Sequence, residues 1–279
     1  GKSWPFIAAA VLVHVYLWCD NADGGHARRT NQCSAKGEFL DHGLDLLNAT
    51  YISCMTVVTL GAPPFWSVVA AVVVPAAAAV TYWEQAETGV FQLGLLNQIE
   101  SIVCLTVALT ARAVFGAEAM AAVTIAGGSL PVLVLGFVTT VAMFGIIRST
   151  MRVAQNRGRL GPALAPYAFG AAVTVAAATG ALGTLAAIIA GAVVFIFIGI
   201  RQLTLRVRGE RPLLERGVLF AAAVLGALAG HRILGGAPNA AMAQSIDWAA
   251  AGVVSVAFGG LALARALEGH RAVERLDRG

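Results

Sequence analysis

Nine apolar segments, each about 17–25 residues long, constrain the fold of this chain more than any other feature. Each segment is long enough to cross the roughly 30 Å hydrocarbon core of a bilayer as an α-helix. The segments lie near residues 4–21, 38–61, 63–83, 95–115, 129–149, 163–180, 182–202, 213–233 and 244–266. Only 12% of the residues are charged, against roughly 25% in a soluble domain. The sequence therefore predicts an all-α, polytopic membrane helical bundle.

The apolar pattern runs through the whole chain as a single unit. No linker, low-complexity tract or shift in composition interrupts it. We therefore predict one membrane-embedded domain over residues 1–279. It comprises a motif-bearing core at 1–115, additional helices at 116–266 and a cytoplasmic tail at 267–279.

The positions of the Lys and Arg residues predict how the bundle is oriented. Sixteen of the 19 fall in four stretches, at 22–37, 148–162, 201–216 and 265–279, which the alternation of spans puts on one side. The positive-inside rule assigns that side to the cytoplasm. Anionic lipid headgroups account for the net charge of +4, so no nucleic-acid partner is expected. The Ala-rich, Arg-over-Lys composition favours a bacterial inner membrane, with the ER or Golgi as the eukaryotic alternative.

Two pairs of aspartates follow the first apolar segment and open the second. Asp20 and Asp23 are three residues apart, and Asp41 and Asp45 are four apart, so on helices each pair projects from one face. Four uncompensated carboxylates at a membrane interface repel one another, and a cation is needed to hold them together. Oxygen ligands in this number suit Mg²⁺ or Mn²⁺. Two such metals are suited to phosphoryl transfer.

The stretch that carries these aspartates resembles a known family signature. Residues 20–45 read DNADGGHARRTNQCSAKGEFLDHGLD, which matches D-x-x-D-G-x-x-A-R-x(8)-G-x-x-x-D-x-x-x-D of the CDP-alcohol phosphotransferase family. The resemblance implies a homodimer in the bilayer that cleaves a CDP-linked substrate at its pyrophosphate, releases CMP and transfers the rest to a hydroxyl group.

By position, the resemblance also implies the binding residues. The four aspartates would hold two Mg²⁺ or Mn²⁺ ions per active site. The cytidine and pyrophosphate of the donor would be lined by Gly24, Ala27, Arg28 and Gly37.

Within that family, two segments are similar to the choline and ethanolamine phosphotransferase branch. They are ARRTNQCSAKGEFLDHGLD, residues 27–45, and YWEQAETGVFQLGLLNQIE, residues 82–100. This likeness implies that His42 and Glu100 serve the acceptor hydroxyl. A His with a reference pKa near 6.5 is suited to accept its proton near neutral pH. Asp45 is the base in the alternative assignment of the wider family. Ten spans are usual in this branch, so one further span is expected in the intact protein.

Three functions are compatible with these patterns, two of them transferases and the third from another class. The favoured one transfers phosphoethanolamine or phosphocholine from a CDP-alcohol to diacylglycerol or a similar lipid. The second uses CDP-diacylglycerol to transfer a phosphatidyl group to a small polar alcohol. The third is a divalent-cation transporter, whose charges should lie near mid-membrane.

Overall fold

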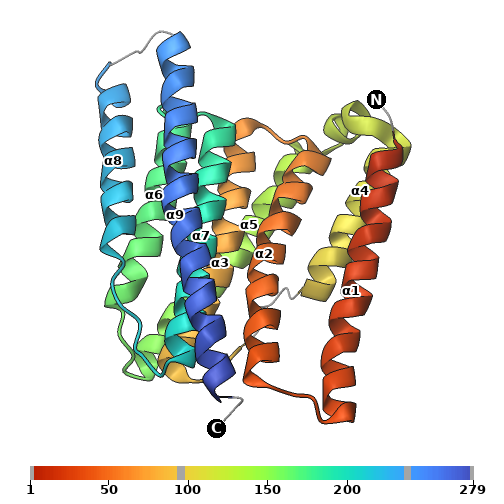
Figure 1. The fold of residues 1–279 in the computed structure, drawn as a ribbon. Helices are drawn as coiled ribbons and strands as arrows, with labels where there is room; N and C mark the ends of the chain where they lie inside the picture. Colours follow the sequence, from red (N-terminus) through yellow and green to blue (C-terminus); the bar gives the residue numbers. More distant parts are fainter. Residues whose placement is uncertain (1–2, 93–97, 236–239, 277–279) are drawn as a thin grey trace.

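The computed structural model describes residues 3–92, 98–235 and 240–276. Within these ranges the chain forms nine α-helices with the length and apolar composition to cross a membrane, so the predicted all-α polytopic fold is confirmed (Figure 1). The helices are α1 (Trp4–Thr30), α2 (Ala35–Leu60), α3 (Pro64–Thr88), α4 (Gln98–Ala122), α5 (Leu130–Gln155), α6 (Leu164–Ala178), α7 (Thr184–Val207), α8 (Arg216–Ile233) and α9 (Ala240–Leu276).

Short elements join some of these helices. A two-stranded antiparallel hairpin, β1 (Thr124–Ile125) and β2 (Gly128–Ser129), connects α4 to α5, with Thr124 opposite Ser129. A 3₁₀ turn, η1 (Gly161–Ala163), precedes α6. The chain bends within α4 at Gly116, whose φ of 79° and ψ of 173° are not helical.

Several helices are longer than the predicted spans, and α1 and α9 extend furthest beyond them. Helix α1 continues past residue 21 to Thr30, and α9 continues past residue 266 to Leu276. The predicted tail at 267–279 is therefore helical over residues 267–276, which the structure describes. Polar residues end a hydrophobic segment but not a helix, because helical backbone hydrogen bonds form in water as well as in lipid. Hydropathy thus marked where the apolar surface ends and missed where the helices end.

The largest apolar core lies around α3 and α7. Buried residues of α3, α5, α6, α7, α8 and α9 form one continuous cluster there. Its centre contains Phe169 and Phe195, whose rings meet edge to face with centroids 5.9 Å apart. Helix α1 lies at the edge of the bundle and packs along α4 (Figure 1). A separate cluster that includes Leu17 and Leu105 fills that contact.

Helix α2, which carries half of the aspartate motif, is held by two close glycine contacts. A Cβ at Gly199 of α7 would lie 2.2 Å from Cδ1 of Leu46, a fully buried residue next to Asp45. A Cβ at Gly269 of α9 would lie 2.3 Å from the ring of Phe39. Because only glycine leaves this space, α7 and α9 fix the position of α2 closely.

We therefore expect Gly199→Ala to lower the melting temperature of the protein. Overpacking of a filled core costs typically about 1–3 kcal/mol, and Leu46 is too buried to move aside. Gly226→Ala on α8 is the matched control, since a Cβ there meets nothing within 4 Å. The check is thermal unfolding of both variants in detergent. A Gly199→Ala protein as stable as Gly226→Ala would contradict the tight contact.

Candidate active site

A short turn brings the two halves of the motif together. Helix α1 ends at Asn31, whose left-handed φ of 54° lets its N–H donate to the Ala27 carbonyl. Helix α2 begins after Ser34, whose hydroxyl oxygen accepts a hydrogen bond from the Gly37 N–H at 3.0 Å. The turn reverses the chain, so α1 and α2 run antiparallel (Figure 1). It also engages the backbone N–H of Gly37 in the helix cap.

The motif residues of α1 lie on one face of the helix. Asp23, Gly24, Ala27 and Arg28 stand three, four, seven and eight residues after Asp20, all before α1 ends. The predicted first span ends near residue 21, and the structure continues the helix through the last three of these residues. The carboxylates and the predicted donor-binding residues therefore share one side of α1.

Helix α2 repeats this arrangement. Gly37, Asp41 and Asp45 are each four residues apart within the helix, so they too share a face. Asp45 is half-buried, whereas Asp41 and Gly37 are exposed near the beginning of α2. The face thus runs from the end of the bundle into its interior.

A polar contact sets the register between the two helices. The Asn48 amide of α2 donates a hydrogen bond to the Tyr16 hydroxyl of α1, which in turn donates to Oδ1 of Asp20 at 2.9 Å. Because α1 and α2 are antiparallel, moving along α1 from Tyr16 to Asp20 covers about the same distance, in the same direction, as moving back along α2 from Asn48 to Asp45. The contact therefore places Asp20 and Asp45 at the same level of the bundle.

The structure groups all four predicted metal-binding carboxylates at one end of α1 and α2. The charges of Asp20, Asp41 and Asp23 all act on Asp45. Those of Asp23 and Asp20 act on Asp41 in the same way. The two pairs thus face a common space from neighbouring helices, as their spacing in the sequence predicted.

The donor set suits a metal, but the side chains do not form a finished coordination sphere. Oδ1 of Asp45 is buried and has no hydrogen-bond partner in the described part of the chain. An unsatisfied carboxylate oxygen among three other carboxylates fits a hard divalent cation. Among the residues the structure describes, however, no three acidic, His or Cys side chains converge closely enough to hold a metal ion. Binding would require rotation of the aspartate side chains toward one another.

His42 lies beside this acidic group in an aromatic environment. Its imidazole stacks on Phe91 with ring centroids 5.0 Å apart and contacts the ring of Tyr82 at 5.7 Å. The Tyr82 hydroxyl donates a hydrogen bond of 2.9 Å to the His42 carbonyl. Nδ1 of His42 is buried and has no partner among the described residues. The ring is therefore oriented by packing, with one nitrogen left for a partner.

Glu100 lies in the first turn of α4 and is exposed. The Thr106 hydroxyl of α4 is 3.1 Å from Nδ1 of His14 on α1. Helices α1 and α4 are antiparallel (Figure 1). The six residues from His14 forward to Asp20 on α1 therefore rise as far along the bundle as the six from Thr106 back to Glu100 on α4. Glu100 therefore lies at about the level of Asp20. The second family-like segment, 82–100, includes residues 93–97, which lie outside the described residues.

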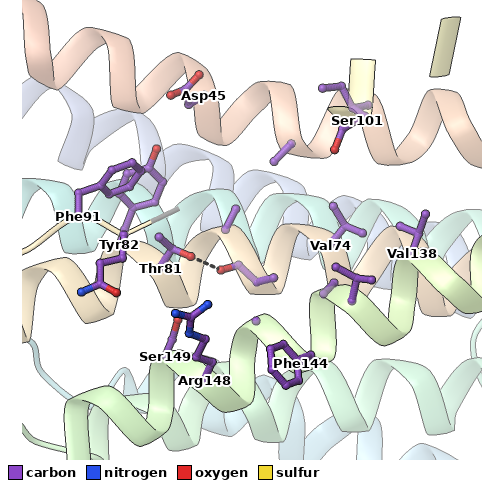
Figure 2. A pocket seen from close by; sticks show the side chains of 18 of the residues that line it. Asp45, Val74, Thr81, Tyr82, Phe91, Ser101, Val138, Phe144, Arg148 and Ser149 are labelled. Atoms are coloured by element: carbon purple, nitrogen blue, oxygen red, sulfur yellow. Dashed lines mark hydrogen bonds between the residues drawn. The ribbon is translucent and has the colours of Figure 1, made fainter. Parts of the chain in front are cut away.

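A cavity of about 240 Å³ extends from Asp45 between α2, α3, α4 and α5. Figure 2 shows Asp45 on one wall and Arg148 and Ser149 on the opposite wall, with Tyr82 and Phe91 at one end. Toward the membrane interior the lining is apolar and includes Val74, Ala78, Val138 and Val141. The cavity thus joins the aspartates to a space that suits an acyl chain.

An ion pair on the far wall of this cavity was not predicted from the sequence. Arg152 of α5 contacts both carboxylate oxygens of Glu84 on α3, with Nη2 to Oε2 at 2.6 Å. Glu84 is 1% exposed. Tyr16 was also missed, although its position four residues before Asp20 signals a contact along the same helix face.

Comparison with known proteins agrees with this geometry. The model of the CDP-alcohol phosphatidyltransferase family matches residues 2–126. Over this region, the chain is similar to the CDP-alcohol phosphatidyltransferase family. The match covers α1–α4, which carry the aspartates, His42 and Glu100.

Similar proteins point to one branch of that family. Cholinephosphotransferase 1 of Xenopus laevis is 31% identical over 117 residues, which cover 41% of this chain and 29% of the relative. Cholinephosphotransferase 1 of Rattus norvegicus is 32% identical over 106 residues, covering 37% of this chain and 27% of the relative. An uncharacterized class-I family protein of Dictyostelium discoideum is 31% identical over 94 residues, covering 34% and 23%. The matched region spans about a quarter of the length of these relatives.

We expect Mg²⁺ or Mn²⁺ to raise the melting temperature of the purified protein, and EDTA to reverse the rise. A ligand bound only by the folded state stabilises it by about 2.7 kcal/mol at 100 times its Kd. Asp41→Asn should lose most of the metal-dependent rise. Glu118→Gln should keep it, because that exposed carboxylate lies at the opposite end of α4 from Glu100. An equal metal-dependent rise in Asp41→Asn and the wild type would count against the metal site.

Proposed function

We propose that this protein is a CDP-alcohol phosphotransferase that moves phosphoethanolamine or phosphocholine from the CDP-alcohol to the hydroxyl of a diacylglycerol-like lipid. The observation that carries the proposal is the cavity that joins Asp45 to an apolar space among α2, α3, α4 and α5. A phosphoryl-transfer centre and a place for a lipid acceptor are then adjacent. The names of the cholinephosphotransferase relatives support the same donor class.

In this proposal the exposed part of the site holds the CDP-alcohol. Arg28 is exposed at the end of α1, and its guanidinium lies over Gly24, whose added Cβ would be 3.3 Å from Nη1. A planar guanidinium is suited to two phosphate oxygens at once. Gly24 and Ala27 leave room on the same face for the nucleotide. Gly37 contributes open space rather than its N–H, which Ser34 already engages.

The four aspartates would hold two Mg²⁺ or Mn²⁺ ions, which would offset the pyrophosphate charge and the charge that develops on CMP. The acceptor oxygen forms a bond to the phosphorus that carries the aminoalcohol. The bond from that phosphorus to the oxygen shared with CMP breaks, and CMP leaves. The proton of the acceptor hydroxyl passes to His42, which Glu100 would orient.

His42 fits the role of base better than Asp45 does. A carboxylate bound to a metal ion is a weak base, because the cation stabilises its charged form. The His42 ring is held by Phe91 and Tyr82. Both of these residues also line the cavity that extends from Asp45. The base therefore lies where the cavity meets the acidic group.

We expect His42→Ala to lower the rate of transfer by about 100- to 10,000-fold, as the loss of a general base does. Binding of the CDP-alcohol should stay nearly unchanged, because His42 is not on the predicted donor face. His231→Ala removes an exposed imidazole from α8 and is the matched control. The assay follows CMP release and lipid product from labelled CDP-ethanolamine. Wild-type turnover in His42→Ala would exclude the assignment.

Substrate choice separates the three functions. With diacylglycerol present, CDP-ethanolamine or CDP-choline should give CMP and phospholipid, and chelation should stop both. Product formed from CDP-diacylglycerol and a small alcohol would instead support the phosphatidyltransferase. Metal uptake into vesicles without CMP release would support the transporter.

We further propose that the motif end faces the cytoplasm, that the protein resides in a bacterial inner membrane, and that it acts as a homodimer. Cys33 lies exposed in the turn between α1 and α2 and tests the orientation. A variant with Cys19, Cys54 and Cys104 replaced by Ser should react with a membrane-impermeant thiol reagent only in inside-out vesicles. Labelling in right-side-out vesicles alone would reverse the orientation. Crosslinking in the membrane tests the dimer.

A further inference from the structure

The Tyr16 hydroxyl lies between the two aspartate-bearing helices and contacts a residue of each. It donates to Oδ1 of Asp20 on its own helix at 2.9 Å. It also interacts with the Asp45 carboxylate on α2, and it accepts a hydrogen bond from the Asn48 amide. Asn48 follows Asp45 by three residues, so both ends of the contact adjoin a predicted metal ligand.

The Tyr16 hydroxyl has one proton to donate. Asn48 supplies an N–H to the phenol oxygen, so the single phenol proton points toward the carboxylates. The proton is donated to Oδ1 of Asp20, Asp45 lies near enough to interact with the same hydroxyl, and Oδ1 of Asp45 stays without a partner among the described residues. The hydroxyl therefore fixes the direction of the two carboxylates without neutralising them.

Most of the packing of α1 and α2 is with other helices. Helix α1 packs along α4, and α2 packs along α3, α4 and α7. The small cluster with Leu17 and Leu105 secures α1 against α4. Ile52 and Met55 of α2 also pack against this cluster, and the contact between Tyr16 and Asn48 adds a polar connection between the facing sides of α1 and α2.

We propose that Tyr16 and Asn48 are positioning residues that set the separation and direction of Asp20 and Asp45 for a divalent cation. This inference rests on the metal-binding part of the proposed function. It assigns the pair no direct role in phosphoryl transfer. Removing a residue that hydrogen-bonds to a metal ligand typically changes metal affinity by about 10- to 100-fold.

The test measures Mn²⁺ binding to the purified full chain by EPR of free Mn²⁺, with no substrate present. Tyr16→Phe should raise the Kd for Mn²⁺ by about 10- to 100-fold, and Asn48→Leu should change it in the same direction. Turnover of Tyr16→Phe at saturating Mn²⁺ should stay near that of the wild type. Tyr51→Phe is the matched control, because Tyr51 is 64% exposed on the outside of α2.

Each outcome decides the inference. A Kd for Tyr16→Phe within twofold of that for Tyr51→Phe would overturn it. So would a fall in turnover that saturating Mn²⁺ does not restore, or loss of the folded state in both test variants, since either result would indicate a role in chemistry or packing. If the wild type binds Mn²⁺ through the aspartates but transfers no phosphoalcohol, the proposed function fails and this inference stands.

Discussion

Repulsion among four carboxylates at the ends of two membrane helices is the constraint on which the rest of this structure depends. Two like charges 4 Å apart repel by about 4 kcal/mol at an effective dielectric constant near 20. A few such pairs rival the total stability of a domain, about 5–15 kcal/mol. The fold meets this constraint by placing the pairs on separate helices, α1 and α2, that are packed against other partners. A bound divalent cation, as proposed above, would relieve this repulsion.

The two helices are held in different ways. Helix α2 fits against glycines of α7 and α9, so its carboxylates are fixed by the main core. Helix α1 is attached through α4 by a smaller apolar cluster and by the contact of His14 with Thr106. The helices after residue 126, outside the match to the family, therefore have a clear task. They provide the rigid wall against which the motif is assembled.

The sequence predicted the features that depend on local spacing and hydropathy. All nine spans are found among the described residues, and the aspartates share helix faces as their spacing required. Helix ends were missed at Thr30 and Leu276, because polarity marks the membrane boundary and does not end a helix. The pairing of Glu84 with Arg152 could not be predicted, since it joins residues 68 apart through the packing of α3 on α5. The stacking of Phe91 on His42 depends on the same tertiary arrangement.

The apolar cavity distinguishes a lipid-handling transferase from a cation transporter. The wall formed by Val74 and Val138 suits acyl chains, whether they belong to a lipid acceptor or to a CDP-diacylglycerol donor. A lipid acceptor buries its chains there, and each buried CH₂ contributes about 0.8 kcal/mol. Its hydroxyl then lies at the polar end, near Asp45 and His42. A cation transporter would instead place its carboxylates near the middle of the membrane, whereas Asp23 and Asp41 are exposed near the adjoining ends of α1 and α2. The position of charge along the helices thus favours catalysis at the membrane surface, and the apolar cavity favours a lipid as one of the substrates.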